Sequence, residues 1–413
     1  MRIIRIVVIL IAVACVPFLS HAAEGQVTSS TQYLWYQDFL SDDIHQSDVA
    51  QYLRLNVTKL DKEGKINMYG YGRVIKQIST SIEDRPELAN DTFGRLYYFY
   101  LDYRDAVKDH MDLKAGRTYI STAAVSGTID GLYVNMKNLG PVGVTLFGGR
   151  NVIFDNKSEI GTGGDALTGM SVYFDTIKYT HVEVSYGRKY TDSDLARENI
   201  GLDFSTTPHE KANIYGRVQY DTIADRCGEL LFGAKLAPLK SLILRGEYFQ
   251  SHPTFDKFSF YSFFAVNNYK EITVSAEYQL TSEYRVNGRY AYEDFGGNVG
   301  NATANVYEVG FFARPIKDLT LNAFYEKRDG YAGRLSGFRF NGEYKIYKAA
   351  ISAGIDYDDF RRESSRDGNA KKYWAGVNYE LNKMFSAVVR VEDNTNFNFD
   401  HSYQGFAAVN VNY

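Results

Sequence analysis

Two histidines lie beside acidic residues in a way that could support hydrolytic chemistry. Asp43 lies two residues before His45, and Asp400 directly precedes His401. A carboxylate that orients an imidazole is part of the general-base arrangement of hydrolases. Such pairs are also common in polar connectors, and both of these fall in polar stretches of the chain. The sequence therefore predicts no enzymatic activity and assigns no catalytic residue.

Motifs for nucleotides, metals and haem are incomplete or missing. Gly161-Thr-Gly-Gly164 is glycine-rich, but no strand–helix unit surrounds it, so a phosphate cradle is not expected. Acidic residues such as Asp91 and Asp393 lack the regular spacing of a calcium-binding loop. The sequence has no Cys-x-x-Cys-His haem-attachment motif and no zinc pattern of Cys and His. We therefore expect no cofactor and no metal ion.

Residues 1–22 have the features of a secretory signal peptide. Arg2 and Arg5 supply the positive start, Ile6–Ala14 is an uninterrupted apolar run, and a small-x-small cleavage sequence ends at Ala22. The run is too short for a membrane anchor. A lipoprotein signal ending at Cys15 is the alternative, but the residues before it match a lipobox weakly. The sequence therefore predicts export from the cytoplasm and cleavage after Ala22.

The predicted mature chain is mildly acidic and contains one cysteine. Removal of Arg2 and Arg5 leaves 44 basic against 50 acidic side chains, which is a net charge of −6. This balance argues against nucleic acid as a partner. Cys15 leaves with the signal peptide and Cys227 remains, so no intramolecular disulfide is expected.

The composition favours a single β-rich domain over residues 23–413. The chain contains 34 Tyr and 26 Phe but only 7 Pro, with no Pro/Ser linker, composition shift or long helical pattern. Its mean hydropathy is −0.33, which is compatible with membrane strands because lipid-facing and lumen-facing residues alternate and average out. A soluble β-sandwich or propeller is the alternative, but such folds need far fewer consecutive strands of even size.

Period-two alternation runs through most of the chain and is clearest in its last eleven residues. Gln404, Asn410 and Asn412 lie on one face there. The opposite face carries apolar, aromatic or small residues: Tyr403, Gly405, Ala407, Val409, Val411 and Tyr413. Strict alternation is typical of a strand between two different environments. Comparable segments run to roughly 10–13 residues, which is enough to cross a bilayer when tilted.

Short and long connectors alternate along the chain, which predicts about 22 strands with a range of 18–24. Short connectors such as Asp61–Gly64 and Pro315–Asp318 alternate with longer polar ones such as Ser79–Asp91 and Asp393–Ser402. Both chain ends then lie on the side of the short turns. The count is least certain at Ser251–Asn268, where residues 258–266 could be an extra strand pair, a strand extension or a loop folded inward.

The whole predicted mature chain resembles the Gram-negative outer-membrane β-barrel proteins of the porin-like class. The alternating final strand that ends at Tyr413 resembles the closing strand of these barrels, which the barrel-assembly machinery reads as a signal. The resemblance implies an all-β, transmembrane, antiparallel up-and-down barrel with periplasmic termini and no plug domain. It also implies a multi-pass location in the cell outer membrane, with membrane lipid and the assembly machinery as partners. Enzymatic barrels usually have far fewer strands.

In such a barrel the polar face of each strand lines the lumen. The charged lumen-lining candidates are Arg54, Asp102, Arg217, Arg245, Glu247, Glu277, Arg285, Arg289, Glu326, Glu343, Glu380, Arg390 and Glu392. Both signs occur in similar number, and most of a wide pore lies beyond a Debye length of about 8–10 Å from any wall charge. Weak ion selectivity is therefore expected. Tyr98, Tyr100, Tyr215 and Trp374 are aromatic candidates for the same face.

The resemblance implies a porin-like channel for passive diffusion of small hydrophilic solutes or ions. The chain departs from the trimeric porins in having more strands and no clear long constriction loop. The alternative is the β-barrel sheath of a porin–cytochrome conduit, in which the barrel insulates a periplasmic multihaem cytochrome held in its lumen for electron transfer to the cell exterior. A third possibility is an export portal for polysaccharide or protein, which would call for lumen aromatics along a spiral track.

Overall fold

The computed structural model describes residues 24–37, 45–80, 92–154, 163–253, 268–296, 302–331, 333–361, 367–397 and 399–413. The predicted signal peptide, the predicted extra strand pair at 258–266, and Asp43, Asp91 and Gly161 lie outside these residues. Among the described residues, no helix is both long and apolar enough to cross a lipid bilayer.

The described residues form 22 strands, which agrees with the number expected from the connectors. Their bounds are β1 (Glu24–Gln37), β2 (His45–Thr58), β3 (Ile66–Thr80), β4 (Thr92–Val107), β5 (Met111–Ser121), β6 (Ser126–Leu139), β7 (Val142–Asn151), β8 (Ala166–Phe174), β9 (Thr180–Thr191), β10 (Asp194–His209), β11 (Ala212–Asp221), β12 (Arg226–Leu239), β13 (Leu242–Ser251), β14 (Tyr269–Gln279), β15 (Tyr284–Asp294), β16 (Thr303–Ile316), β17 (Leu319–Gly330), β18 (Gly333–Ile346), β19 (Ala349–Arg361), β20 (Gly368–Glu380), β21 (Phe385–Asn396) and β22 (Phe399–Asn412).

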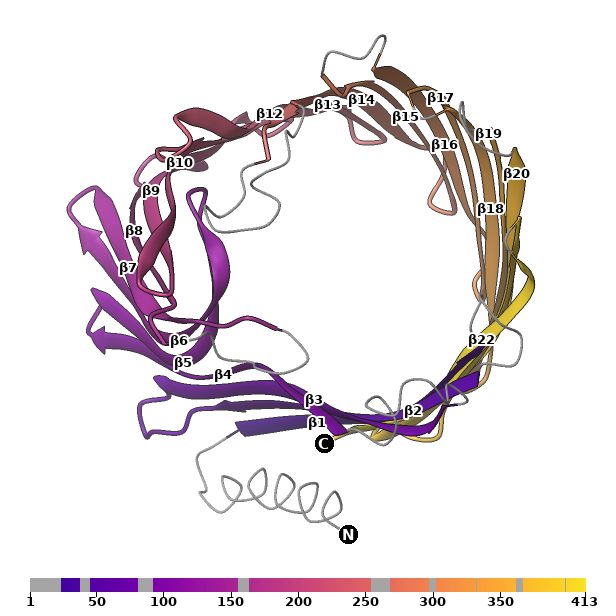
Figure 1. The fold of residues 1–413 in the computed structure, drawn as a ribbon, viewed down its shortest axis with the longest axis horizontal. Coiled ribbons are helices and arrows are strands. Elements are labelled where there is room, and N and C mark those ends of the chain that lie inside the picture. The colour runs from indigo at the N-terminus through magenta and orange to yellow at the C-terminus, as the bar shows by residue number, and fades with distance from the viewer. Residues whose placement is uncertain are drawn as a thin grey trace.

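The sheet closes on itself into a barrel, as Figure 1 shows from one end. Each strand pairs antiparallel with the next, and β1 pairs with β22 through the register Thr28↔Asn412. The amide of Val27 donates to the carbonyl of Tyr413 at 2.8 Å, and the amide of Tyr413 donates back to Val27 at 2.8 Å. Closure pairs every strand on both sides, which is the condition for a sheet inside lipid.

The alternation along each strand separates an apolar outer face from a polar inner face. On β22 the predicted apolar residues point outward, and Tyr403 and Val409 are 52% and 51% exposed. Large exposed hydrophobic side chains recur on strand after strand around the barrel. An apolar surface of this extent is unstable in water, so its natural environment is lipid.

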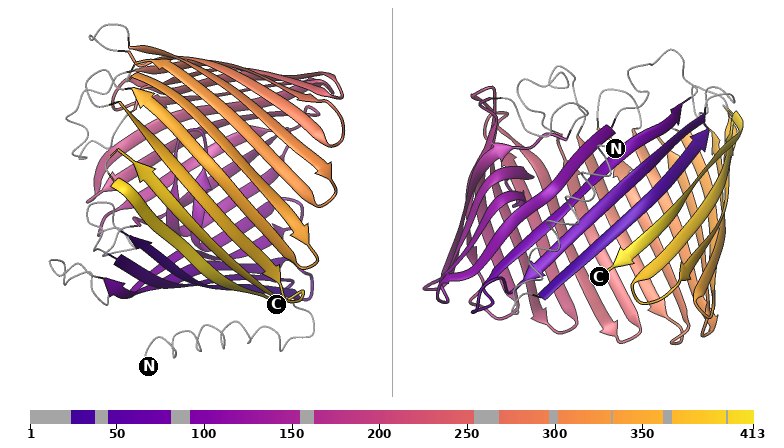
Figure 2. Two further views of the ribbon diagram at one scale, coloured as in Figure 1. Left: turned by 90° about the vertical axis from the view of Figure 1, so that its right-hand side faces the viewer. Right: turned by 90° about the horizontal axis from the view of Figure 1, so that it is seen from below.

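Tyr403 in β22 and Tyr413, which directly follows β22, lie at the spacing of two membrane interfaces. Tyr403 and Tyr413 are ten residues apart on the outer face, which corresponds to roughly 34 Å along a strand. A strand tilt of about 35–45° reduces this to roughly 24–28 Å across the membrane, close to the apolar band of about 25 Å found in such barrels. The tilt of the strands is visible in Figure 2.

The predicted short turns, which follow the even-numbered strands, lie at one end of the barrel, where both described ends of the sheet also lie. The connectors at the opposite end include long ones and also brief ones, such as those after β9 and β17. The β2–β3 turn is typical of the predicted short turns. Asp61 accepts a hydrogen bond from the amide of Ile66 at 2.8 Å, and this bond lowers the pKa of the Asp61 carboxyl. Gly64 adopts φ +71° there, a conformation that glycine reaches without strain.

One predicted long connector is wrong. The interval Asp393–Ser402 is mostly strand, because β21 continues to Asn396 and β22 begins at Phe399. Some of its polar residues belong to the lumen face, where Asn394 and Ser402 are cross-strand partners, whereas Asp393 pairs with Tyr403 on the outer face. Polar composition therefore indicated a loop where the chain forms the polar ends of two strands.

Candidate functional site

The lumen contains a β-hairpin that belongs to the barrel wall at its base and folds inward at its tip. The hairpin consists of the outer halves of β5 and β6 and the turn Thr122–Val125. Figure 1 shows it inside the ring formed by the other strands. The sequence showed no clear long constriction loop, and the connector between β5 and β6 is short. The inward element is instead made of the ends of the strands themselves.

The tip of this inward hairpin is hydrogen-bonded to the inner wall of β9, β10 and β11. The amide of Ala124 donates to Ser185 Oγ at 3.0 Å. The carbonyl of Ala124 accepts from Asn199 Nδ2 at 2.9 Å and from Gln219 Nε2 at 3.0 Å. Gln219 also donates to the carbonyl of Ala123 at 3.1 Å. Ser185 and Asn199 are 1% exposed, so the tip seals these polar groups from the lumen.

Apolar packing and a glycine complete the docking surface. Five buried residues form a cluster between the hairpin and the wall: Ile120, Val125, Ile129, Phe147 and Leu167. Each fully buried side chain of this size contributes about 1.5–3 kcal/mol relative to exposure. Gly201 lies directly under the turn, where a Cβ atom would overlap the backbone nitrogen of Ala124. The close approach therefore requires glycine.

The hairpin leaves the wall at a neck formed by Gly116, Arg117 and Asp130. Gly116 has φ +123°, and a Cβ there would overlap the carbonyl oxygen of Phe99. Next to it, Arg117 donates to both carboxylate oxygens of Asp130, at 2.8 and 2.9 Å, and to the carbonyl of Leu96 at 2.9 Å. Arg117 is 7% exposed. This bidentate pair joins β5 to β6 where both strands turn inward.

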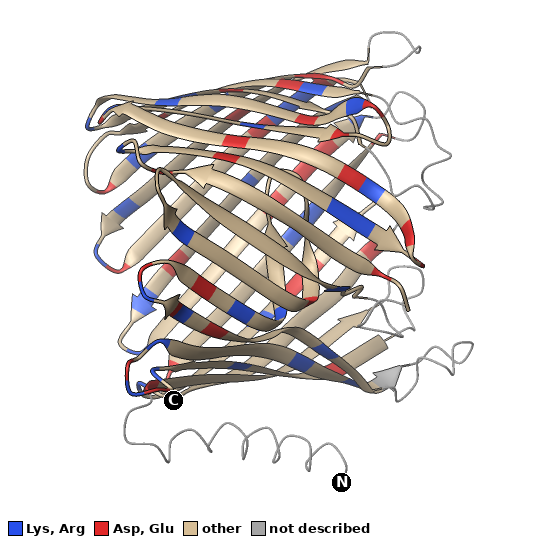
Figure 3. Cartoon of the chain, turned by 90° about the vertical axis from the view of Figure 1, so that its left-hand side faces the viewer, with Lys and Arg blue, Asp and Glu red and all other residues tan. Residues whose placement is uncertain are grey.

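The opposite wall carries a ladder of ion pairs across β14–β21. Arg289 lies between Glu271 and Glu308, at 2.5 and 2.8 Å. Arg339 lies between Glu326 and Asp358, at 3.4 and 3.7 Å. Further pairs join Arg328 to Glu293 at 2.7 Å and Lys372 and Arg390 to Glu392 at 2.9 and 2.7 Å. Figure 3 shows charges of both signs interspersed along the strands.

The structure places the charged candidates from the sequence on the inner face of the wall. Residues that are cross-strand partners point to the same face of the sheet. Asn199 and Gly201 lie under the inward hairpin and therefore face the lumen. The registers between neighbouring strands then identify the lumen-facing residues from strand to strand around the barrel. Several are paired: Arg217 with Asp203 at 3.0 Å, Arg285 with Glu277 at 3.6 Å, and Glu247 with the hydroxyl of Tyr215 at 2.5 Å. On the same face are Arg54, Asp102, Arg245, Arg289, Glu326, Glu343, Glu380, Arg390 and Glu392.

The aromatic candidates also face the lumen, together with one tyrosine that the alternation assigned to the other side. Trp374 lies under the guanidinium of Arg390 at 4.1 Å. Simple alternation along β4 would place Tyr97 on the lipid face, together with Phe99 and Leu101. The register between β3 and β4 shifts at Tyr71 and Gly72, and this bulge turns Tyr97 inward against Tyr71 at a ring separation of 4.8 Å. Simple alternation cannot reveal such a shift.

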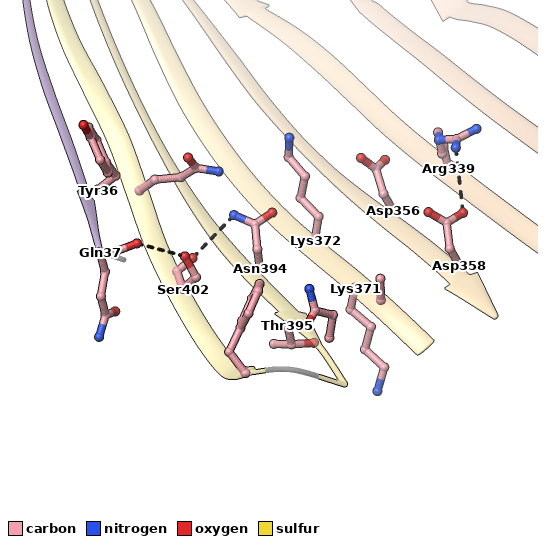
Figure 4. Close-up of a pocket in the computed structure, with 14 residues that line it drawn as sticks. Tyr36, Gln37, Arg339, Asp356, Asp358, Lys371, Lys372, Asn394, Thr395 and Ser402 are labelled. Carbon is pink, nitrogen blue, oxygen red and sulfur yellow. Dashed lines mark hydrogen bonds and ion pairs between the residues drawn. The ribbon is translucent and has the colours of Figure 1, made fainter. Parts of the chain in front are cut away.

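A polar pocket of about 610 Å³ opens on the lumen side near the ends of β1 and β18–β22 that lie opposite the short turns. Arg339, Asp356, Asp358 and Lys372 line it in Figure 4. Ser402 Oγ donates to the carbonyl of Gln37 at 3.3 Å across the barrel seam. The charges of the pocket largely belong to the ion-pair ladder, so it forms a mixed-charge vestibule.

The described residues place no group of three or more His, Cys, Asp or Glu where a metal ion could bind. His401 pairs with Asp393 at 3.1 Å rather than with Asp400. His401 lies in the strand β22 and not in a polar connector, as its surroundings in the sequence suggested. Cys227 is a free cysteine on β12.

No protein-family profile matches the chain, and no curated protein sequence matches it either. Solved structures do match over almost the full length. A BenF-like porin from Pseudomonas fluorescens Pf-5 aligns with 95% of this chain and 98% of its own, at 10% identity and a TM-score of 0.50. OccAB2 from Acinetobacter baumannii aligns with the same shares, at 10% identity and a TM-score of 0.51.

The fold is that of an outer-membrane porin. At 10% identity the likeness concerns the fold alone. It agrees with the resemblance that the alternating strands predicted. The porin fold puts the inner wall and the inward hairpin in contact with whatever occupies the lumen, so these surfaces form the candidate functional site.

Proposed function

We propose that this chain forms a porin-like channel in the outer membrane of a Gram-negative bacterium, through which small hydrophilic solutes or ions diffuse passively. The observation that carries the proposal is the closed sheet with an apolar outer face and a polar inner wall. A barrel of this strand number has a wide interior. Polar and charged side chains solvate a water column in such an interior.

The inward hairpin narrows this channel on one side, and the ion-pair ladder lines the other side. Because most ladder cations have acidic neighbours within 4 Å, their fields largely cancel at the centre of the pore. We therefore propose a channel that selects weakly by charge and mainly by size.

The first experiment separates an open channel from an occupied one. The barrel is purified from its own membranes in mild detergent, and its visible absorption spectrum and co-purifying proteins are recorded. A colourless barrel without a cytochrome is expected. A haem band with a stoichiometric multihaem cytochrome would overturn the channel proposal in favour of the electron-conduit alternative, which no observation on the described residues favours.

The second experiment measures permeation. The purified chain is reconstituted in planar bilayers, and in liposomes for swelling assays with uncharged sugars of increasing size. We expect ohmic conductance proportional to bulk conductivity and swelling rates that fall with solute size. Folding is checked by the heat-dependent shift in electrophoretic mobility. A folded, colourless barrel that passes neither ions nor sugars would contradict the proposal.

A further inference from the structure

A column of aromatic side chains lies along the lumen wall, mainly on β3 and β4, beside the inward hairpin. It consists of Tyr69, Tyr100, Tyr98, Tyr71, Tyr97 and Phe154. Successive ring centroids lie 5.3, 5.9, 5.8, 4.8 and 6.1 Å apart in that order. Tyr69 lies near the short-turn end of the barrel, where β3 begins, and Phe154 follows the opposite end of β7. The rings therefore form a continuous path along the direction of transport.

A cation lies over four of the six rings of the column. Lys114 Nζ lies 5.8 Å from the ring centroid of Tyr100, and the guanidinium of Arg54 lies 4.9 Å from that of Tyr71. Higher on the wall, Arg73 lies 5.8 Å from Tyr97 and Arg95 lies 5.4 Å from Phe154. A guanidinium over a ring is held by cation–π attraction while its N–H edge stays available to an anion.

The positive charge along the aromatic column is less compensated by carboxylates than the positive charge of the opposite wall. Within the described part of the chain, Arg54, Arg73 and Lys114 form no ion pair with a carboxylate, whereas Arg289 and Arg339 each form two. The nearby acid Asp102 is 5% exposed and accepts from Arg104 at 3.0 Å. The column is thus a positively charged aromatic surface in a lumen whose other charges are largely paired.

The local backbone is adapted to build this surface. The bulge between β3 and β4 places two consecutive residues, Tyr97 and Tyr98, on the lumen side. A regular strand would have directed one of them into lipid. Phe154 comes from a different part of the wall and extends the path upward.

We propose that the column is a binding track for anionic oligosaccharides, whose sugar rings pack on the tyrosine and phenylalanine rings and whose carboxylates pair with Arg54, Arg73 and Lys114. This inference rests on the proposed channel function and names a substrate class for it. Aromatic faces accept the C–H faces of sugar rings, and arginine pairs with carboxylates through charge-assisted hydrogen bonds. The repeat of ring and cation along the wall suits a ligand that repeats ring and carboxylate.

An extended ligand fits the column better than a single ring does. One ring with one carboxylate contacts a single level, and the other levels then contribute nothing. A chain of several acidic sugars contacts several levels at once, so its contacts act together as linked sites do. The wide lumen leaves room for such a chain beside the hairpin.

The test uses the full chain reconstituted in planar bilayers, with tetragalacturonate as the probe. Three further probes separate the contributions: galacturonate for length, maltotetraose for charge and benzoate for an aromatic single-ring anion. Current blocks are counted, and their residence times are measured. We expect tetragalacturonate to give the longest blocks, galacturonate short ones, and maltotetraose few.

Two double variants with the same change of charge provide the comparison. Arg54→Gln/Arg73→Gln removes two column cations, and Arg289→Gln/Arg339→Gln removes two cations from the ion-pair ladder. A charge-assisted hydrogen bond is worth roughly 1.5–3 kcal/mol, so the first variant should shorten tetragalacturonate blocks at least about tenfold. The second should change them less than about threefold, because its cations already have carboxylate partners.

The possible outcomes distinguish this inference from the channel proposal. Blocks by benzoate as long as those by tetragalacturonate would overturn the extended track. Equal blocks by maltotetraose, or equal effects of the two double variants, would overturn the role of the column cations. A conducting channel that none of the probes blocks would overturn the track and leave the channel proposal standing. If the barrel does not conduct, calorimetric titration with tetragalacturonate in detergent still tests the track, and no heat of binding would overturn it.

Discussion

The Arg117–Asp130 pair is far more buried than an exposed ion pair such as Arg334–Asp329. Arg117 has a side-chain exposure of 7% and donates three hydrogen bonds. Arg334 and Asp329 lie 2.9 Å apart, but their side chains are 69% and 47% exposed. Exposed pairs contribute about 0–1 kcal/mol, whereas removal of one partner from a more buried, hydrogen-bonded pair leaves polar groups unsatisfied.

We therefore expect Arg117→Ala to lower the free energy of unfolding by roughly 1–3 kcal/mol, because Asp130 and the carbonyl of Leu96 lose their donor. Arg334→Ala is the matched control and should change it by less than about 1 kcal/mol. Urea-induced unfolding in lipid vesicles, followed by tryptophan fluorescence, measures both. Equal effects of the two variants would show that the neck pair carries no special stability.

At the scale of elements, the inward hairpin is held by contacts that a single side chain can remove. Gly201 leaves room for the turn, and four hydrogen bonds join the tip to β9, β10 and β11. Each such bond contributes about 0.5–1.5 kcal/mol net. The hairpin is thus a docked element whose position depends on the wall behind it.

Gly201→Val should displace the tip, because its Cβ would overlap the backbone of Ala123 and Ala124. We expect greater open-channel current noise and a lower unfolding temperature, since the released hairpin moves in the lumen. Gly246→Val is the control, because a Cβ atom at Gly246 would have no heavy atom within 4 Å beyond its chain neighbours. Unchanged noise in a folded Gly201→Val barrel would mean that the hairpin stays docked by other contacts.

The outward face of β22 is the element that we propose as the assembly signal, with the barrel-assembly machinery and membrane lipid as its partners. Val409→Asp/Tyr413→Asp places two charges on the lipid face, whereas Asn410→Asp/Asn412→Asp places two on the lumen face of the same strand. Charges on the lipid face cost up to about 2–4 kcal/mol at the midplane and less near the interfaces.

We expect the outward variant to reduce the amount of folded barrel in the outer membrane severalfold and the inward variant to leave it nearly unchanged. Heat-dependent electrophoretic mobility of isolated outer membranes measures the folded amount. Equal loss in both variants would assign the effect to charge near the end of the chain, rather than to the lipid-facing side chains.

At the scale of the whole molecule, the inner wall consists of two unlike halves. The ladder on β14–β21 pairs its charges, while the aromatic column on β3 and β4 leaves cations without carboxylate partners among the described residues. At 1 M salt, where the Debye length is about 3 Å, neither half influences the centre of a wide pore. At 0.01 M the Debye length is about 30 Å, so the cations of the column influence the centre of the pore, whereas the paired charges of the ladder largely cancel there.

We therefore expect a reversal potential near zero across a twofold KCl gradient at about 1 M and a distinctly larger one at about 0.01 M. The Arg54→Gln/Arg73→Gln barrel should shift the low-salt value towards cation preference, because the column loses uncompensated positive charge. A strong, salt-independent selectivity would indicate a narrow filter that the wall charges alone do not provide.

Much of the fold could be predicted from the sequence because a membrane barrel imposes its two environments residue by residue. The alternation of Tyr403 to Tyr413 assigns both faces of β22 without reference to any neighbour, and the phase of the short turns yields the number of strands. The lumen-side placement of residues such as Arg217 and Glu277 follows from the same period. Prediction failed where polarity was interpreted as a loop, as at Asp393–Ser402.

Only the tertiary structure decided the features that depend on strand register and on contacts between distant segments. Tyr97 faces the lumen because the β3–β4 pairing contains a bulge, and a single strand carries no record of its partner's register. The hairpin folds inward because Gly201 and Asn199, more than seventy residues beyond its turn, form the surface that receives it. Solvent and lipid act locally on each side chain, so they leave a periodic trace in the sequence. Packing between β5–β6 and β9–β11 depends on pairs of positions, and no periodicity within either segment reveals it.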